Sequence, residues 1–544
     1  MTDWNFADNW EIAAEVRGEA RALVHGSTTT SWRELDRRAA GVARSLLEHG
    51  LGHQAKVAQY LYNCNEYLEA VFAAEKVSMV PVNTNYRYAD EELVYLWENS
   101  DTEAVVFHGS FLPTVERLRP RLGRVKLWLH VDDGTGSAPS WAVAYEEAAG
   151  SLAEGESTHV TGPVPRSGDD LYLLYTGGTT GMPKGVMWRQ DDIWALLNAG
   201  SPLPMPDDRG MDGVREAIEA LSEHPPTVLP ACPLMHGTGA FTAFSALMLG
   251  GCVVTEASRA FDPVRLLDTV EREKVNLVTI VGDAFAKPIA NALDEHPGRW
   301  DLSSLLGMIS SGVMWSEETK RRLLRHNPAM MLIDAFSSSE ALGMGSSIST
   351  AGSEAHTAAF KIGEQTKVID DDGNEIVPGS GRAGRLALGG RLPLGYYKDE
   401  AKTASTFLTI GGERYSVPGD YAIVEADGSL HLLGRGSVSI NTGGEKVFPE
   451  EVEETLKTHP AVADAVVVGV PDERFGEAIT AAVQLAPGAT VSEDELVRLV
   501  KSRHAGYKAP RHVLFVDSVG RTPSGKVDYK AVRELAMDRL GVSP

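Results

Sequence analysis

Cysteine, basic residues and long apolar runs are all scarce in this sequence of 544 residues. Its three cysteines, Cys64, Cys232 and Cys252, are too few and too far apart for a disulfide framework, which favours a reducing compartment. No run of about 18 apolar residues could cross a membrane, and the start MTDWNFADNW lacks the features of a secretory signal. We therefore expect a cytoplasmic protein without a transmembrane segment.

Positive charge is the second deficit. The chain has 51 Lys and Arg against 75 Asp and Glu, a net charge of −24, with an isoelectric point near 5.1. Such a surface repels nucleic acid and anionic lipid, so we expect neither as a partner. With 43% hydrophobic and 23% charged residues the composition is ordinary for a globular protein, and the length predicts about two to four domains.

Several common catalytic motifs are missing as well. The sequence contains no HExxH, no paired CxxC and no G-x-S-x-G. These motifs carry the zinc ligands of many metalloenzymes and the nucleophile of many serine hydrolases. The sequence therefore gives no support to a zinc enzyme or to such a hydrolase.

Short β-branched runs alternate with amphipathic stretches over most of the chain. Six runs predict strands buried on both faces: 104–107, 125–129, 171–176, 252–255, 275–281 and 330–336. Helical periodicity lies between them, for instance at 32–50 and 261–274. This alternation predicts an α/β fold of helix-covered, mostly parallel sheets.

The pattern changes twice towards the C-terminus. Turn signals between short strands from about 360 to 434 predict a β-rich subdomain within a large N-terminal domain, residues 1–434. A boundary follows at 435–440. Beyond it, residues 441–544 predict a small α+β domain, with helices at 451–460 and 492–504 and strands at 463–470, 477–485 and 512–519.

The segment YTGGTTGMPKGV, residues 175–186, is the most informative of the chain. Its glycines let backbone N–H groups approach anionic oxygens, its threonines add donors, and Lys184 adds a positive charge. Pro183 before the lysine and Gly185 after it exclude a Walker A loop, and the spacing is not GxGxxG. A flexible surface turn is the alternative, but the whole string favours a phosphate-binding loop.

Five further motifs follow this loop in order: PLMHGTG (233–239), DAFSSSE (334–340), YSVPGD (415–420), Gly434-Arg435 and TPSGK (522–526). Together they resemble the ANL adenylate-forming superfamily, which comprises acyl-CoA synthetases, peptide-synthetase adenylation domains and luciferases. The resemblance covers nearly the whole chain. It implies that the small C-terminal domain is mobile and turns on a hinge at 435–440.

The resemblance also implies an ATP and AMP site with Mg²⁺. Lys526 would bridge the substrate carboxylate and the α-phosphate, and Glu340, His236 and Thr176 are the other catalytic candidates. Glu340 and Thr176 would bind the metal. The nucleotide would contact Thr176, Gly177, Gly178, Thr179, Thr180, Gly181, Lys184, Asp334, Ala335, Phe336, Ser339, Asp420, Arg435 and Lys526.

Each of these positions, taken singly, also fits an ordinary structural role. Glu340 suits a solvated carboxylate at a helix start, and His236 suits a structural histidine on an apolar stretch. Lys526 in a glycine-containing loop suits a solvent-exposed lysine. The ordered set of motifs, rather than any one residue, favours the functional assignment.

The resemblance places two further sites. Acyl-binding residues would be His236, Phe241, Gly282, Asp283, Gly312, Met314 and Met344, and CoA-binding residues would be Thr442, Gly443 and Gly444. The small or flexible members of the acyl set suit a bulky apolar acid. Asp283 leaves two alternatives open, because it would either hold a polar group of the substrate or face away from it.

These sites imply an acyl-CoA synthetase that forms an acyl-AMP and then a thioester, with ATP, Mg²⁺, coenzyme A and a small-molecule carboxylic acid as partners. TGGTTGMPKGVMW and GRGSVSINTGGEKVFPEEVE are most similar to fatty-acyl and steroid side-chain CoA ligases, which favours a long-chain or bulky apolar acid. The alternatives are an aryl or medium-chain acid, a luciferase-like monooxygenase, or a non-catalytic nucleotide-binding relative. A homodimer is a habit of the class, but this sequence does not indicate an oligomeric state.

Some positions depart from the family pattern. Gly177 replaces a serine of the phosphate loop, and Pro418 replaces a threonine before Gly419-Asp420. Ser437 stands where the family often has a hinge aspartate. This last difference concerns the energetics of the hinge rather than the chemistry.

Overall fold

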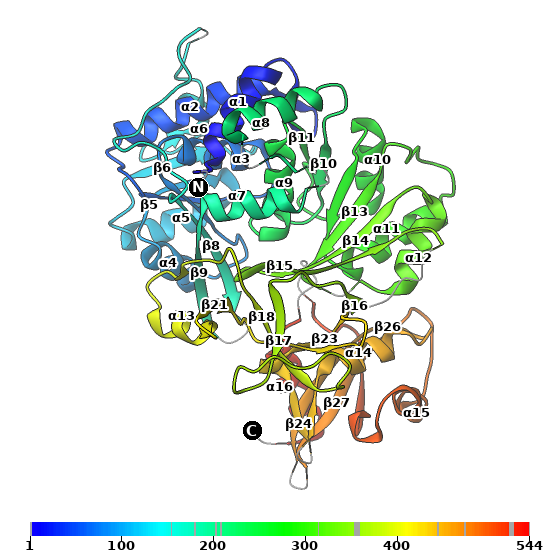
Figure 1. The fold of residues 1–544 in the computed structure, drawn as a ribbon. Coiled ribbons are helices and arrows are strands. Elements are labelled where there is room, and N and C mark those ends of the chain that lie inside the picture. Colours follow the sequence, from blue (N-terminus) through cyan, green and yellow to red (C-terminus); the bar gives the residue numbers. More distant parts are fainter. Residues whose placement is uncertain are drawn as a thin grey trace.

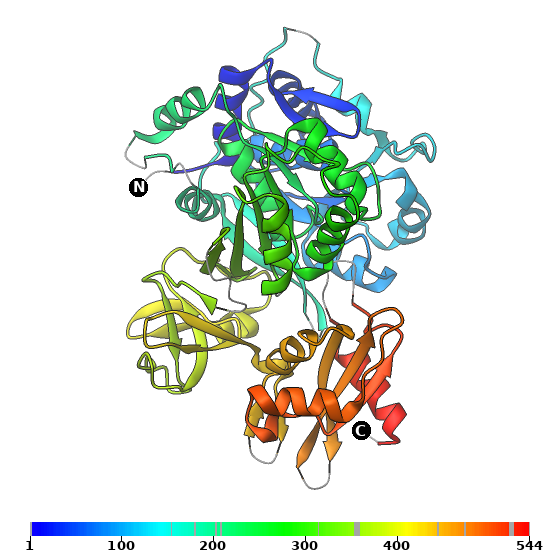
Figure 2. The same cartoon turned by 90° about the vertical axis from the view of Figure 1, so that its right-hand side faces the viewer.

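The computed structural model describes residues 3–153, 155–178, 181–201, 204–206, 209–313, 315–352, 359–442, 445–472, 475–521 and 527–542. Two large sheets with their helices form the upper part of the molecule in Figure 1, and a β-rich sheet and a small C-terminal domain lie below them. Figure 2 shows these two lower parts side by side beneath the large one.

The first large sheet has eight strands in the order β15-β14-β13-β12-β10-β11-β1-β2. Its inner strands are parallel, and β2 and β15 add antiparallel edges. The strands are β1 Arg21–His25, β2 Thr28–Ser31, β10 Thr227–Pro230, β11 Cys252–Thr255, β12 Leu277–Ile280, β13 Gly307–Ser311, β14 Met331–Ser338 and β15 Ala341–Ser349.

The second large sheet also has eight strands, in the order β19-β9-β8-β4-β3-β5-β6-β7. It is parallel from β8 to β7, while β9 and β19 run antiparallel at one edge. The strands are β3 Lys56–Tyr60, β4 Val80–Asn83, β5 Thr102–His108, β6 Leu127–Val131, β7 Val143–Ala144, β8 Leu171–Gly178, β9 Gly181–Arg189 and β19 Gly395–Tyr396.

Some helices of this large part begin at clear capping signals. Ser31 accepts a hydrogen bond from the backbone of Glu34 at the start of α2, and Asp262 followed by Pro263 starts α10. The helices are α1 Phe6–Arg17, α2 Trp32–Glu48, α3 Asn65–Lys76, α4 Asp90–Asn99, α5 Leu112–Leu118, α6 Tyr145–Ala149, α7 Gln190–Ala199, α8 Gly210–Ala220, α9 Gly237–Met248, α10 Pro263–Glu273, α11 Asp283–Glu295, α12 Glu317–His326 and α13 Glu400–Thr406.

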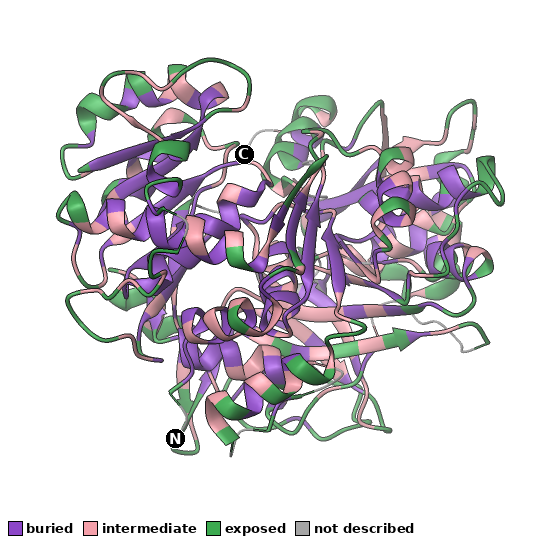
Figure 3. Cartoon of the chain, turned by 90° about the horizontal axis from the view of Figure 1, so that it is seen from above, coloured by how far each residue is buried: buried purple, intermediate pink, exposed green. Residues whose placement is uncertain are grey.

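Apolar packing arranges these elements in five layers. One core joins α1, α2, α3, α7 and α9 to strands of both large sheets, so these helices lie between the sheets. A second core packs α10, α11 and α12 on the outer face of the first sheet, and a third packs α4 and α5 on the second. Figure 3 shows the result as buried strands flanked by helices whose outer faces are exposed.

The β-rich sheet and the C-terminal domain complete the chain. The first contains β16 Ala359–Phe360, β17 Thr366–Ile369, β18 Ala383–Leu388, β20 Phe407–Ile410, β21 Glu413–Ser416, β22 Asp420–Val424 and β23 Leu430–Arg435. The second contains β24 Ile440–Thr442, β25 Glu445–Val447, β26 Val462–Asp472, β27 Gly476–Leu485 and β28 His512–Val516 with α14 Pro449–Lys457, α15 Glu493–Arg503 and α16 Tyr529–Leu540. A short 3₁₀ turn, Gly436–Val438, joins the two sheets.

The fold class predicted from the sequence is confirmed. All six predicted strands occur, and so do the helices predicted at 32–50 and 261–274. The prediction that 330–336 is buried on both faces is wrong, because Ile333, Ala335 and Phe336 of β14 are only partly buried. These residues line a cavity instead. Among the helices of the described residues, none combines the length and apolar character needed to span a membrane.

Candidate active site

An open cavity of about 1740 Å³ lies where the two large sheets, the β-rich sheet and the C-terminal domain meet. Small-molecule sites commonly enclose roughly 300–1,000 Å³, so this cavity has room for more than one reactant. Residues from β8, α9, β13, β14 and β22 line it, and Arg521 and Tyr529 close it from the C-terminal domain.

The predicted phosphate loop is the end of a β-hairpin formed by β8 and β9. Thr176 is paired with Lys184, and Gly178 with Gly181, across the hairpin, and Thr179 and Thr180 lie outside the described residues. Thr176 and Lys184 line the cavity. Packing explains the glycine at position 185, near the end of the motif, because a Cβ there would lie 2.6 Å from the Tyr175 ring.

The lysine of this hairpin is already paired. The Lys184 ammonium contacts the carboxylate of Asp399, the N-cap residue of α13. This contact lowers the pKa of Asp399 below its ordinary value, and a hydrogen bond from the backbone of Lys402 adds to the effect. Any anion that binds Lys184 would therefore have to compete with Asp399.

Strands β14 and β15 form the hairpin that carries DAFSSSE, with Ser339 and Glu340 at its turn. Two side chains from the second large sheet hold this turn. The Tyr396 hydroxyl donates to Glu340 Oε1 at 2.6 Å, and Trp188 Nε1 donates to the Ser339 carbonyl at 2.9 Å. The sequence analysis missed Tyr396 and Trp188, since both resemble ordinary core aromatics.

Replacing Tyr396 by Phe should reduce kcat/KM for ATP by at least about tenfold. The ring stays packed on Phe407, with 6.0 Å between centroids, so only the hydroxyl that orients Glu340 is lost. A hydrogen bond to a charged group contributes roughly 1.5–3 kcal/mol. Steady-state kinetics with varied ATP would measure the loss, with Tyr397→Phe as control, because the Tyr397 hydroxyl donates to Asp101 instead. Equal kinetics of the two variants would contradict the role of Tyr396.

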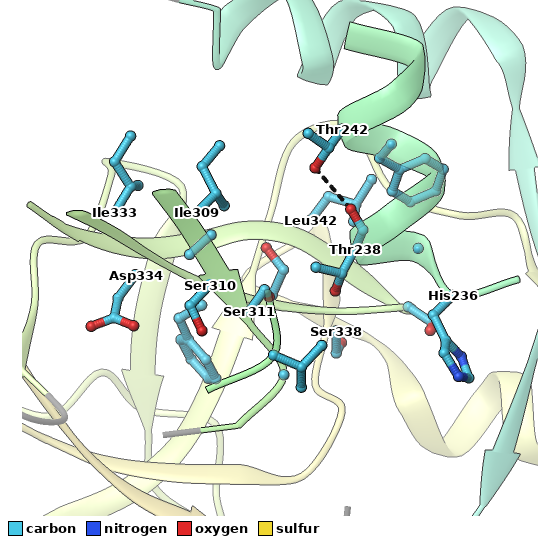
Figure 4. A pocket seen from close by; sticks show the side chains of 18 of the residues that line it. His236, Thr238, Thr242, Ile309, Ser310, Ser311, Ile333, Asp334, Ser338 and Leu342 are labelled. Atoms are coloured by element: carbon cyan, nitrogen blue, oxygen red, sulfur yellow. Dashed lines mark hydrogen bonds between the residues drawn. The ribbon is translucent and has the colours of Figure 1, made fainter. Parts of the chain in front are cut away.

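Side chains alternate along β13 and β14 and divide the cavity wall. Figure 4 shows Ile309 and Ile333 on one side of these strands and Ser310 and Asp334 on the other. Asp334 is buried and forms an ion pair with Lys320 of α12. Burial raises the pKa of Asp334, and Lys320 opposes that rise. The predicted adenine residues Asp334, Ala335 and Phe336 all line the cavity, and so does Ser339.

Asp420 begins β22 and lies opposite Arg435, its partner in β23. The turn before it requires glycine, because Gly419 has a φ of +103°. Asp420 is buried and lines the cavity. The side chain of Arg435 lies outside the described part of the structure.

A trough leads from His236, the N-cap residue of α9, along the first sheet. One wall is formed by one face of α9 and the residue that follows it, with Thr238, Phe241, Thr242, Ser245 and Leu249. The other wall is formed by alternate residues of β13 and β14: Gly307, Ile309, Ser311, Met331, Ile333 and Ala335. Four residues of strand separate Ala335 from Met331, which makes the trough roughly 13 Å long. Leu306 and Met331 at its far end are 57% and 45% exposed, so this end is open.

The predicted acyl residues lie in different places. His236, Phe241 and Gly312 line the cavity, whereas Gly282, Asp283 and Met344 are not among the described residues that do. Asp283 opens α11, where its Oδ1 accepts from the Ser316 backbone at 3.1 Å and its carboxylate pairs with Lys287 at 3.4 Å. Met344 is buried with Leu388 and Leu392. Met314 lies outside the described residues.

The C-terminal domain contributes residues on both sides of one predicted motif to the cavity lining. Arg521, Val527 and Tyr529 line it on either side of 522–526, and Lys526 itself lies outside the described residues. Arg521 is held by Asp464 of β26 at 2.5 Å. Thr442 is buried against Gly476, and its strand β24 lies at the lower end of the molecule in Figure 1. Gly443 and Gly444 also lie outside the described residues.

Two family models match the chain. The AMP-binding enzyme model covers residues 10–397, and the AMP-binding enzyme C-terminal domain model covers residues 451–526. The chain is 43% identical over 99% of its length to a 3-oxocholest-4-en-26-oate--CoA ligase of Rhodococcus rhodochrous, 96% of which is covered. It is 40% identical over 98% of its length to a medium/long-chain-fatty-acid--CoA/3-oxocholest-4-en-26-oate--CoA ligase of Mycolicibacterium smegmatis, 97% of which is covered.

Solved structures share the fold. The crystal structure of the anthranilate CoA ligase AuaEII in complex with anthranoyl-AMP matches with a TM-score of 0.83 at 22% identity, over 100% of this chain and 99% of that one. The family models and the relatives agree with the ordered motifs. The chain belongs to the AMP-binding enzyme family, the ANL adenylate-forming superfamily that its motifs resemble.

Proposed function

We propose that this protein is an ATP-dependent acyl-CoA synthetase acting on a long-chain or bulky apolar carboxylic acid. A carboxylate oxygen attacks the α-phosphorus of ATP, the bond to the bridging oxygen breaks, and pyrophosphate leaves. The CoA sulfur then attacks the acyl carbon of the acyl-AMP, loses its proton, and AMP leaves. The protein aligns the reactants and stabilises the charge that develops.

The trough is the observation that supports an apolar acid. Its sheet wall is formed mainly by Ile309, Ile333 and Met331, and it opens at the far end rather than closing on a short substrate. With the carboxylate near His236, the chain or ring system of the acid lies along these side chains. The substrates in the names of the bacterial relatives, fatty acids and a steroid acid, are of this apolar kind.

Thr176 and Lys184 are the proposed ligands of the β- and γ-phosphates. Both line the cavity on facing strands, where a hydroxyl and an ammonium donate to the same anionic group. Lys184 has to exchange Asp399 for phosphate, which couples nucleotide binding to the start of α13. Phe336 and Asp334 would bind adenine, and Asp420 would accept both ribose hydroxyls.

Glu340 and Thr176 fit a magnesium site that ATP completes. Among the described residues no group of three or more His, Cys, Asp or Glu is placed to hold a metal. Mg²⁺ is commonly bound by one or two carboxylates together with substrate phosphates, which suits one carboxylate and one hydroxyl. When bound, the ion neutralises phosphate charge, while Tyr396 keeps the Glu340 carboxylate oriented.

The C-terminal domain is proposed to serve the two half-reactions in turn, rotating about the hinge at 435–440. Its orientation here suits the first, because the residues flanking 522–526 line the cavity. Thr442, Gly443 and Gly444 would meet CoA only after rotation, since β24 lies away from the large sheets (Figure 1).

Pyrophosphate release from a panel of acids, with and without CoA, tests the proposed function. Long-chain and steroid acids should give CoA-dependent release of AMP and thioester, with kcat/KM rising from acetate through octanoate. Each CH₂ buried in the trough should add ~0.8 kcal/mol, about fourfold in affinity. If acetate or benzoate had the highest kcat/KM, the assignment of a long-chain or bulky acid would be rejected, and only the assignment as a ligase would remain. A requirement for oxygen would favour the luciferase-like monooxygenase. If no acid gave pyrophosphate release, the result would favour a non-catalytic protein.

Replacing Thr242 by Trp should shorten the range of acids. Thr242 faces Ile309 across the trough (Figure 4), so an indole there blocks the path while acetate and butyrate still fit. We expect octanoate and longer acids to lose the advantage of each CH₂ beyond the block, ~0.8 kcal/mol apiece. Thr242→Val keeps the volume and is the matched control. An unchanged chain-length profile in Thr242→Trp would place the acid elsewhere.

A further inference from the structure

Lys320 is a charged residue with no exposed side-chain surface and a partner in the nucleotide site. It lies on α12, and its ammonium pairs with the Asp334 carboxylate. The Trp315 ring, 5.7 Å from Nζ, covers it. Lysine is almost never fully buried unless it is paired, which makes Asp334 the reason for its position.

The charged groups around Asp334 come from two helices. Lys320 of α12 favours the ionised carboxyl, whereas Asp283 at the start of α11 disfavours it, as burial does. Asp283 is itself paired with Lys287 of the same helix. Without the Lys320 charge, burial and Asp283 act unopposed and raise the pKa of Asp334 further.

The protonation state of Asp334 decides which purine edge it can bind. An ionised carboxylate only accepts hydrogen bonds and matches the 6-amino group of adenine. A protonated carboxyl also donates, and then it matches the 6-oxo group of hypoxanthine or guanine. An asparagine here would present a donor and an acceptor without any charge, so it would match either edge and need no cation behind it.

We propose that Lys320 is a positioning residue that holds Asp334 as an oriented carboxylate and thereby makes the nucleotide site select a 6-amino over a 6-oxo purine. This inference rests on the proposed function, in which Asp334 faces the adenine. Lys320 itself lies behind Asp334 in the wall and is not among the described residues that line the cavity. Its effect on the base is therefore indirect.

The test compares ATP with inosine triphosphate in acid-dependent pyrophosphate release by the full chain between pH 6 and 9. The wild type should prefer ATP across this range. In Lys320→Met the ATP-to-ITP ratio of kcat/KM should fall at least tenfold at pH 6. It should recover as the pH rises through the raised pKa of Asp334, because the carboxyl then loses the proton with which it binds a 6-oxo group.

Two further variants separate this role from a merely structural one. Lys320→Arg keeps the charge and should retain the wild-type preference. Lys320→Met combined with Asp334→Asn buries a neutral pair, so its ratio should be low and independent of pH. If Lys320→Met does not fold, this double variant decides the question, and a wild-type ratio in it overturns the proposal.

A Lys320→Met enzyme that keeps the wild-type ratio at every pH, whatever its thermal stability, also overturns the inference. That outcome is distinct from failure of the proposed function. If only the inference about Lys320 fails, ATP still supports pyrophosphate release with an apolar acid, and only the origin of base selection is wrong. If the proposed function fails, no acid and no nucleotide gives pyrophosphate release in the wild type.

Discussion

Replacing Lys526 by Ala should abolish acyl-AMP formation from acid and ATP, yet leave the conversion of supplied acyl-AMP and CoA to thioester intact. The expected loss in the first half-reaction is ~10²–10³-fold, which corresponds to a few kcal/mol of charge stabilisation at ~1.4 kcal/mol per tenfold. Pyrophosphate release measures the first step, and thioester formation from synthetic acyl-AMP measures the second.

The expectation rests on where the flanking residues lie. Arg521 is anchored to Asp464, Tyr529 begins α16, and the described residues on either side of 522–526 line the cavity. In the proposed mechanism Lys526 would act at the nucleotide in this orientation of the domain and would leave it when the domain turns. Lys530→Ala is the matched control, because Lys530 is an exposed lysine on α16. Equal loss of both half-reactions in Lys526→Ala would contradict the prediction that Lys526 serves only the formation of acyl-AMP.

Replacing Ser437 by Pro should retain acyl-AMP formation and lose thioester formation. Ser437 is the middle residue of the 3₁₀ turn Gly436–Val438. A 3₁₀ turn has φ near −50° to −70°, which is close to the angle that proline imposes, and the preceding Gly436 has no Cβ to clash. The variant should therefore fold in the present orientation and be locked there.

The proposed rotation of the C-terminal domain would change a backbone angle in this turn. If Ser437 supplies this change, the fixed φ of proline opposes the second orientation, and we expect a loss of ~10²-fold in the second half-reaction, which corresponds to about 3 kcal/mol. Ser437→Ala keeps the rotational freedom and should behave as the wild type. Single-turnover assays of the two steps give the measurement. If Ser437→Pro had unchanged overall turnover, the hinge would have to be another residue of 435–440.

Local pattern predicted a large part of this molecule. Strand runs such as 252–255 and helices such as 32–50 follow from side-chain periodicity and capping, which depend on residues near in sequence. The phosphate loop and the DAFSSSE motif were also found from the sequence. Each lies on a single hairpin, so the spacing of its residues along the chain already sets their spacing in space.

Contacts between distant segments could not be predicted in this way. Glu340 meets Tyr396 over 56 residues of sequence, and Lys184 meets Asp399 over 215. Neither pair belongs to one hairpin or one helix turn. They form because β19 joins the edge of the second sheet beside β9, an arrangement set by how the sheets pack.

The acyl residues show the same limit. The sequence alone left open whether Asp283 faces the acid, and the structure turns it towards Ser316 and Lys287 at the start of α11. The sequence by itself determined the family, the order of the motifs and seven predicted nucleotide-binding residues that line the cavity, because short motifs carry their own geometry. Only the tertiary structure decided which side chains contact these residues: Tyr396 donates to Glu340, and Lys320 pairs with Asp334. Burial brings these side chains together although they share no local pattern.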